Sequence, residues 1–511
     1  MNKFTAALVA TVGTVSAQII DCADAVTNGG LPISEAACNR FPFIAEAVEF
    51  DCNNYSWDII DVQTADGADI SLINFLGDSD FNLLPGQGTK GPVLLRHGLE
   101  EDAYSWFSGS PNITFTPCKL FAAGYDVYIE QGRGKGDALT APPQTEEFWD
   151  FNFETIGTED LQAEVRAILE SRAANLNVCE KVQVINYDAA AQTTAIGLLS
   201  QPTSSAAYIS NVVNQVPCMV YKSDVIEGIF ADPSDDRRRL NEARELGSSY
   251  SYYYHQPSHY YCDKTPYYAK FNEIRNELSY EEYHKFYNHF MQWRYTGDNW
   301  WACDDSVFDA INDALCKVQP SNSDCQPANQ ARFYALINAL RDAGFYSLYG
   351  DRADEQVAAV CAALGDESNE CKNLTSIVGN LSRQGPCETS LQVLEHAYQQ
   401  SQYGEFTAYN SNFELDGWFT AGSPFALEDI TNRMYNEFVQ GDQLCDEVLN
   451  ESILDRVPSQ VKSALWKDGT THSGSQALQT CANEGAFEQL LSELESIPES
   501  ADCAALADAW V

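Results

Sequence analysis

Residues 182–199 read VQVINYDAAAQTTAIGLL, a short apolar strand that runs directly into a helix of small residues. The run 182–185 has the length and composition of a buried strand, and 189–199 forms the helix. A strand followed at once by a helix is the repeating unit of chains that alternate the two elements. The stretch therefore predicts an α/β protein.

The same alternation continues on the N-terminal side of this stretch. A strand is expected at 59–64, where the chain then enters a tight turn, and apolar strands follow at 93–95 and 125–129. Residues 160–169 carry apolar side chains at helical spacing. This order of elements predicts a mostly parallel central sheet with helices on both faces.

The pattern changes after Cys218 and resumes near Ser390. The segment between them holds charged clusters, a tyrosine-dense stretch and mainly helical periodicity, which indicates a helix-rich insertion that caps an α/β core. We therefore predict four regions: a signal peptide at 1–17, the first part of the core at 18–218, a helical cap insertion at 219–387, and the second part of the core at 388–511.

The first residues are typical of an export signal. Lys3 is followed by the apolar stretch 4–15, and Val15-Ser16-Ala17 offers small residues for cleavage before Gln18. A buried N-terminal helix is the alternative. No later stretch is apolar for about twenty residues, so we expect no transmembrane segment. These features predict a secreted, extracellular protein or one in the lumen of the secretory–lysosomal pathway.

Cysteine usage agrees with export. Sixteen cysteines are scattered from Cys22 to Cys503, with no CxxC pair and no zinc spacing, which is typical of structural disulfides. The pairing stays open, although two neighbouring groups suggest local links: Cys303, Cys316 and Cys325, and Cys361, Cys371 and Cys387. Five acceptor sequons predict glycosylated surface positions: Asn54, Asn112, Asn373, Asn380 and Asn450.

The charge limits the possible partners. With 74 acidic and 30 basic side chains the formal net charge is −44, so the surface repels nucleic acid and anionic lipid head groups. The sequence contains no phosphate-binding glycine loop, dinucleotide fingerprint or EF-hand loop. We therefore expect no nucleic-acid partner, no cofactor and no metal.

Several segments, taken together and in order, resemble the acid lipase family of gastric and lysosomal lipases. They are 55–68, PVLLRHGL at 92–99, FAAGYDVY at 121–128, QGRG at 131–134, FWDFNF at 148–153, and 390–409 with His396. The resemblance covers about residues 50–218 and 388–480 and is weak in the insertion. It implies the α/β-hydrolase fold and, for family members, ester hydrolysis by a Ser, Asp, His triad.

The resemblance also implies positions for that triad. The nucleophile of such enzymes sits in a Gly-x-Ser-x-Gly turn, but here Asp188 falls at the serine position, and Asn186 and Ala190 fall at the two glycines. Asp442 matches the acid and His472 the base, although the family's usual Asp-Phe after the histidine is absent. The backbone N–H groups of the oxyanion hole are expected from two residues, Leu99 and Ala189.

Three interpretations of Asp188 remain open. In the first, the site is non-catalytic, Asp188 forms an ion pair with His472, and the protein binds a lipid or acyl ligand under the cap or an extracellular protein partner. In the second, Asp188 is the nucleophile of a hydrolase acting on epoxides or alkyl substrates, with His472 and Asp442. The third covers a nucleophile at another position, a shifted match between this sequence and the family around the turn, or a weak residual carboxylic-ester hydrolase.

Other residues carry weaker hypotheses. Residues 249–268 are dense in tyrosine and form either a binding surface or a disulfide-braced loop. Arg237-Arg238-Arg239 is either a protease processing site or a solvated loop. Residues 280–295 favour core packing in the cap, and His97 is expected to be a satisfied histidine beneath the oxyanion loop.

Overall fold

The computed structural model describes a large part of the chain. The described residues are 34–42, 44, 45, 48, 52, 55–78, 82, 87–99, 101–107, 115–137, 142–222, 270, 271, 274, 275, 278, 283, 285–287, 290, 311, 328–348, 352–365, 371, 372, 374, 388–410, 422–439, 442, 444–466, 484–494 and 498–503. Outside them lie the predicted signal peptide, His472, the tyrosine-dense stretch, Arg237–Arg239 and four of the five sequons.

A single eight-stranded sheet organises the described core, in the order β1-β2-β4-β3-β5-β6-β9-β10. The strands are β1 (Ser56–Gln63), β2 (Asp69–Gly77), β3 (Pro92–Arg96), β4 (Asp126–Gln131), β5 (Val182–Tyr187), β6 (Ile209–Gln215), β9 (Arg433–Val439) and β10 (Gln460–Trp466). β2 is antiparallel to both of its neighbours and the other pairs are parallel. This order and direction are those of the α/β-hydrolase fold, so the predicted fold class is confirmed.

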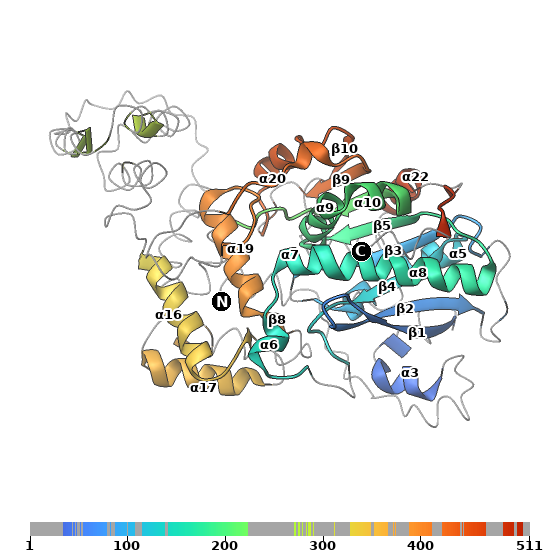
Figure 1. The fold of residues 1–511 in the computed structure, drawn as a ribbon, viewed down its shortest axis with the longest axis horizontal. Coiled ribbons are helices and arrows are strands. Elements are labelled where there is room, and N and C mark those ends of the chain that lie inside the picture. Colours follow the sequence, from blue (N-terminus) through green and yellow to red (C-terminus); the bar gives the residue numbers. More distant parts are fainter. Residues whose placement is uncertain are drawn as a thin grey trace, which may run out of the picture. The chain divides into compact units, whose positions relative to one another are not determined.

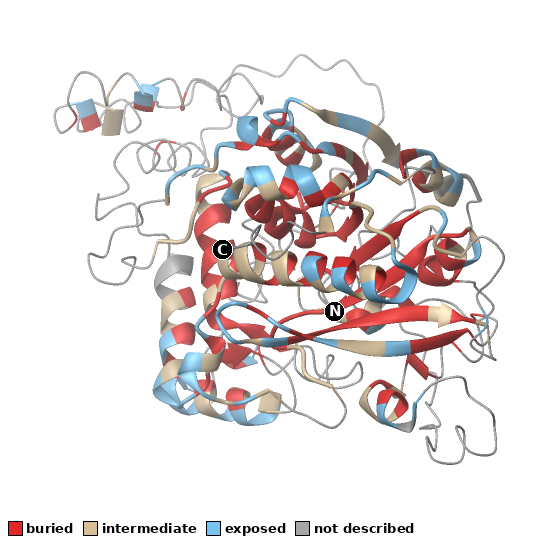
Figure 2. Cartoon of the chain, turned by 45° about the vertical axis from the view of Figure 1, so that its right-hand side comes forward, coloured by how far each residue is buried: buried red, intermediate tan, exposed pale blue. Residues whose placement is uncertain are grey.

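Helices cover both faces of the sheet (Figure 1). One face packs on α3 (Glu35–Arg40), α5 (Thr116–Ala122) and α22 (Glu484–Glu493) through a cluster that includes Phe75, Leu95 and Ile185. The other carries α8 (Leu161–Leu176) and α9 (Ala190–Ser200). Because side chains alternate along a strand, Arg96 and Asn186 point to this second face. Figure 2 shows that the central strands are buried throughout.

The remaining described elements connect or flank this core. They are η1 (Ala103–Phe107), α6 (Glu146–Trp149), α7 (Phe153–Thr155), the π-helical turn η2 (Ile156–Asp160), α10 (Pro202–Tyr208), α16 (Ala328–Asp342), β7 (Ser347–Leu348), α17 (Ala353–Leu364), β8 (Thr389–Ser390), α19 (Leu391–Tyr403), η7 (Leu427–Asp429) and α20 (Glu447–Leu454). No helix among the described residues is long and apolar enough to cross a membrane.

Two glycines allow α9 to pack against η2. A Cβ atom on Gly157 would lie 2.5 Å from the Thr193 carbonyl oxygen, and one on Gly197 would lie 2.5 Å from the Gly157 carbonyl oxygen. Backbone atoms at this distance have no room for a side chain, so glycine is required at both positions. The contact fixes α9, the helix that follows the turn at Asp188.

The chain divides into two compact units, one formed by Met1–Ile229, Asn338–Tyr409 and Ser423–Val511, the other by Phe230–Ile337 and Asn410–Gly422. Residues 338–387, which the sequence analysis assigned to the insertion, group with the first unit. The boundaries of the cap stay a prediction, because most of 223–327 lies outside the described residues.

Four disulfides link described residues: Cys52–Cys118, Cys179–Cys503, Cys218–Cys445 and Cys361–Cys371. The last confirms one of the local links suggested by the sequence. The surface position predicted for Asn450 is wrong. Its side chain is fully buried, accepts from the N–H groups of Met219 and Val220 at 2.7 and 2.9 Å, and has no room for a glycan.

Candidate active site

Asp188 occupies the turn between β5 and α9, where α/β hydrolases carry their nucleophile. Its φ of 53° lies in the left-handed region, which aspartate enters more readily than most residues. The turn is held by backbone bonds, since the Asp188 N–H donates to Gln215 O and the Cys218 N–H donates to Asp188 O, both at 3.2 Å. A Cβ on Gly98 would lie 2.8 Å from the Asp188 Cβ, so only glycine lets the two segments meet.

The Asp188 carboxylate is buried and is held by two donors on one oxygen. Its Oδ2 accepts from the Leu99 N–H at 3.0 Å and from the Tyr221 hydroxyl at 2.7 Å. Tyr221 is itself buried. The Leu99 N–H, expected in the oxyanion hole, is therefore bonded to the side chain at the nucleophile position.

The Cys218–Cys445 disulfide lies beside the same carboxylate. Cys445 Sγ is 3.8 Å from Asp188 Oδ1, and the two sulfurs and an Asp188 oxygen lie within 4.8 Å of one another. These residue types can ligate a metal, but a disulfide sulfur is neither a thiolate nor a proton donor. The contact is therefore van der Waals packing that closes the Oδ1 side of Asp188.

Asp442 follows β9, on the loop where the sequence placed the acid. Its side chain is buried, and Oδ1 accepts from the N–H groups of Leu444 at 2.8 Å and Cys445 at 3.2 Å. Lys222 Nζ donates to its carbonyl oxygen. Cys445 thus touches both aspartates, through its N–H and its sulfur. His472 follows β10 in the chain and lies outside the described residues.

The second expected oxyanion donor, Ala189, is the N-cap of α9. No side chain caps this helix, and the N–H groups of Ala189 and Ala190 have no acceptor among the described residues. The two expected oxyanion donors therefore differ. The Leu99 N–H is bonded to Asp188, whereas the Ala189 N–H has no acceptor among the described residues.

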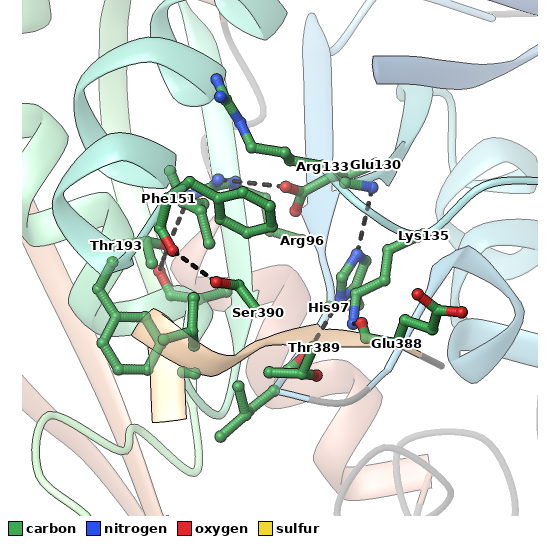
Figure 3. A pocket seen from close by; sticks show the side chains of 18 residues that line it. Arg96, His97, Glu130, Arg133, Lys135, Phe151, Thr193, Glu388, Thr389 and Ser390 are labelled. Atoms are coloured by element: carbon green, nitrogen blue, oxygen red, sulfur yellow. Dashed lines mark hydrogen bonds and ion pairs between the residues drawn. The ribbon is translucent and has the colours of Figure 1, made fainter. Parts of the chain in front are cut away.

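A cavity of about 50 Å³ lies next to this helix start (Figure 3). Its wall includes Leu99, Ala189 and Ala190 but not Asp188. The other lining residues are Arg96, His97, Gly98, Glu130, Gly132, Arg133, Lys135, Phe151, Phe153, Ile156, Thr193, Glu388, Thr389, Ser390 and Val393. Its volume leaves room for a few water molecules or a small group.

Buried charges beneath the cavity are paired. Arg96 bonds Glu130 and Glu164, each at 3.2 Å. Burial and the neighbouring Glu130 charge raise the pKa of Glu164 well above its usual value. Burial also acts to raise the pKa of Glu130, but the Arg96 charge, the neighbouring His97 and the hydrogen bonds with Glu164 and Arg96 together outweigh it and leave that pKa lowered. One arginine charge is therefore shared by an ionised and a protonated carboxyl.

His97 is a satisfied histidine. Its Nδ1 contacts the Gly98 carbonyl oxygen at 3.0 Å and its Nε2 accepts from the Gly132 N–H at 3.3 Å (Figure 3). Burial lowers its pKa, so the ring is neutral, with its proton on Nδ1. This agrees with the sequence interpretation.

Three hydrogen-bonded side-chain amides lie under the turn, and the sequence did not predict them. Asn186 donates to Asn214 and Asn214 donates to Asn436, both at 2.8 Å, across β5, β6 and β9. The Thr194 hydroxyl of α9 donates to Asn186 Oδ1 at 2.8 Å. The three asparagines align only through the strand order and register of the sheet, which the sequence does not give. Asn186 therefore ties α9 to the sheet, in addition to replacing a glycine.

The comparisons with known proteins point to lipases. No protein-family model matches the chain. Lipase member M of Mus musculus is 28% identical over 183 residues, which are 35% of this chain and 40% of that protein. Gastric triacylglycerol lipase of Homo sapiens is 31% identical over 120 residues, which are 23% of this chain and 28% of that protein. The matched segments thus span less than half the length of either relative.

Among solved structures, a soluble variant of monoglyceride lipase from Saccharomyces cerevisiae is similar at 12% identity and a TM-score of 0.38, over 85% of this chain and 92% of that chain. The homologues of this chain are therefore lipase family members at about 30% identity, and its own sheet has the α/β-hydrolase topology.

Proposed function

We propose that this protein is a non-catalytic, lipase-like α/β hydrolase that acts by binding a lipid or acyl ligand. One observation carries the proposal: the carboxylate at the nucleophile turn accepts a bond from the Leu99 N–H. In an ester hydrolase that N–H stabilises the charge that develops on the substrate oxygen. Here the Asp188 carboxylate already occupies it.

The chemistry of a carboxylate supports the same conclusion. A serine hydroxyl attacks an acyl carbon after a histidine takes its proton, whereas Asp188 has no proton to give. Its attack on an ester would form a mixed anhydride, which is less stable than the ester. Loss of a triad nucleophile lowers turnover by on the order of a millionfold in a serine hydrolase. Ester hydrolysis is therefore expected at background level.

The four disulfides fit an extracellular or lumenal location. We therefore propose that the protein is secreted and meets its ligand there. A protein partner remains the other form of this proposal.

A hydrolase with Asp188 as nucleophile is the second candidate. The observation in its favour is that one carboxylate oxygen is fixed by Leu99 and Tyr221, which orients the group. An Asp188 oxygen would bond to an epoxide carbon as its C–O bond breaks, and the resulting alkoxide would take a proton from water. A second water, deprotonated by His472, would then attack the carboxyl carbon of the alkyl ester and release the diol and the Asp188 carboxylate. The Cys445 sulfur on the Oδ1 side leaves little space for such an attack.

Hydrolysis of fluorogenic short- and long-chain esters and of an epoxide panel from pH 4 to pH 8 tests these alternatives. The assay compares the native protein with Asp188→Ser, Asp188→Asn and a control, Asp58→Asn, which changes an exposed carboxylate on β1. No native turnover, with ester hydrolysis gained by Asp188→Ser, would support the proposal. Native turnover that Asp188→Asn abolishes would refute it and make Asp188 the nucleophile.

A further inference from the structure

Asp188 and the two cysteines of the neighbouring disulfide bring three metal-ligating side chains together. All three are buried, and one ligand atom of each, the sulfurs of Cys218 and Cys445 and an Asp188 oxygen, lies within 4.8 Å of the others. We propose that reduction of the Cys218–Cys445 disulfide converts this cluster into a zinc site, with both thiolates and the Asp188 carboxylate as ligands. The inference goes beyond the proposed function and does not depend on it.

The spacing of the cysteines along the chain gives no sign of this cluster. Zinc motifs in a sequence place pairs of ligands a few positions apart, whereas Cys218 and Cys445 are separated by 227 positions. The expectation of no metal was drawn from such local spacings. In the oxidised protein the two sulfurs are bonded to each other, so the site exists only after reduction.

The step that opens the site is thiol–disulfide exchange with a small dithiol. One thiolate of the dithiol attacks a sulfur of the Cys218–Cys445 bond, forms a mixed disulfide and releases the other cysteine. The second thiolate of the dithiol then closes on the first and releases the remaining cysteine. The dithiol gives up two electrons and two protons, and the protein gains them as two thiols. Zinc displaces those two protons, because the thiolate is the form that binds a metal.

The separations of the ligand atoms suit a tetrahedral zinc ion. Zinc binds sulfur at about 2.3 Å and carboxylate oxygen at about 2.0–2.2 Å, so a sulfur and an oxygen on one ion lie about 3.6 Å apart, and two sulfurs about 3.8 Å apart. Cys445 Sγ and Asp188 Oδ1 are 3.8 Å apart. The Cα atoms of the two cysteines are 5.4 Å apart, so rotation of their side chains is enough to separate the sulfurs once the bond is broken.

The Asp188 carboxylate is already oriented for such a site. Its Oδ2 accepts from the Leu99 N–H at 3.0 Å and from the Tyr221 hydroxyl at 2.7 Å, and Oδ1 is the oxygen beside Cys445. Carboxylates that bind a metal are held in this way by hydrogen bonds to neighbouring groups. Leu99 and Tyr221 therefore fix the third ligand before the metal arrives.

The two loops that carry the cysteines are also joined by bonds that do not involve sulfur. Tyr221 and Cys445 form an antiparallel backbone bridge, and the Lys222 N–H donates to Leu444 O at 3.0 Å. The Asn450 side chain accepts from two consecutive N–H groups of the first loop, at 2.7 and 2.9 Å. These bonds do not depend on the disulfide, so the two thiols are expected to stay close together after reduction.

The ligand types select the metal. Thiolates are soft ligands that suit zinc, whereas calcium and magnesium require oxygen ligands in larger number. Three protein ligands leave the fourth tetrahedral position to a water molecule. Zinc is therefore the metal with which the site is tested.

The experiment uses the full-length protein, folded with its disulfides and then reduced anaerobically with a phosphine, which leaves no thiol to compete for the metal. After the phosphine is removed, zinc chloride is titrated by calorimetry, and circular dichroism monitors the fold. We expect the reduced protein to remain folded and to bind zinc, and the oxidised protein to lack this site. Loss of the fold on reduction, or equal zinc binding before and after reduction, would overturn the proposal.

Matched variants locate the site among the sixteen cysteines. The reduced double variant Cys218→Ser/Cys445→Ser is expected to bind about one zinc ion fewer per chain than the reduced native protein. The control Cys361→Ser/Cys371→Ser removes the same number of cysteines from a disulfide that belongs to no such cluster among the described residues, and it is expected to bind zinc as the native protein does. Equal losses in the two double variants would overturn the assignment.

Asp188→Asn tests the third ligand and keeps every cysteine. It is expected to weaken zinc binding at least tenfold, and Tyr221→Phe, which removes a donor to that ligand, about tenfold. Asp58→Asn, on the exposed side of β1, is expected to leave the affinity unchanged. Equal affinity of Asp188→Asn and Asp58→Asn would overturn the role of the carboxylate and with it the proposed site.

Discussion

Replacing Asp160 by asparagine is expected to remove a pH dependence of stability. Asp160 is fully buried beside Arg133, and burial raises its pKa from 3.8 to about 6, although the arginine acts in the opposite direction. A carboxyl whose pKa is higher in the folded state stabilises the protein at low pH. That stabilisation is lost as the pH rises through the folded value.

The magnitude follows from the two pKa values. The difference between 3.8 and about 6 corresponds to about 3 kcal/mol, of which about 2 kcal/mol is lost between pH 4 and pH 7. Asparagine resembles the protonated acid and does not titrate. The free energy of unfolding of the native protein, relative to Asp160→Asn, is therefore expected to fall by about 2 kcal/mol over this range.

Urea unfolding at pH 4, 5, 6 and 7 measures this difference. Asp58→Asn is the matched control, because Asp58 is exposed on β1 and its replacement is expected to leave the pH profile parallel to the native one. Parallel profiles for the native protein and Asp160→Asn would refute the reasoning, since the buried carboxyl would then not gain a proton on folding.

Three further changes test the site and the fold. Tyr221→Phe removes a hydrogen-bond donor that shares Asp188 Oδ2 with the Leu99 N–H and is expected to lower the free energy of unfolding in urea by about 1.5–3 kcal/mol; an unchanged value would contradict this contact. Gly197→Ala places a Cβ 2.5 Å from Gly157 O and is expected to cost about 1–3 kcal/mol, detectable as a lower Tm. Peptide mass spectrometry is expected to find Asn450 without a glycan, and a glycan there would disprove its burial.

Three of the strands that the sequence predicted are rich in apolar residues, with at most one polar residue in each predicted stretch. The predictions at 93–95, 125–129 and 182–185 overlap β3, β4 and β5. β6 and β9 were missed because a buried asparagine interrupts each of them, Asn214 and Asn436. Those amides bond each other across the sheet. A pattern along the chain cannot reveal a partner on a neighbouring strand.

In the candidate site, too, some features could be predicted from the sequence and others could not. The turn at Asp188 was predictable, because a strand, an aspartate and a helix of small residues follow one another in the sequence. Tyr221 was not, since it lies 33 positions away and reaches Asp188 only after the chain has formed β6. The Cys218–Cys445 link spans 227 positions and joins loops from two different strands. Contacts of this kind depend on the order of strands in the sheet, which local patterns do not contain.

The surroundings of Asp188 argue that the site is organised around a carboxylate. Tyr221 is buried, and its hydroxyl donates to Asp188 Oδ2; a serine at this position would place its oxygen closer to the backbone and leave that donor without the acceptor it now has. A bond to a charged group contributes about 1.5–3 kcal/mol. The Leu99 N–H also donates to this carboxylate, and without that acceptor it would face the cavity. The disulfide then fills the Oδ1 side. Residues on three separate loops thus contact the Asp188 carboxylate, and these contacts support the proposed non-catalytic role of the turn.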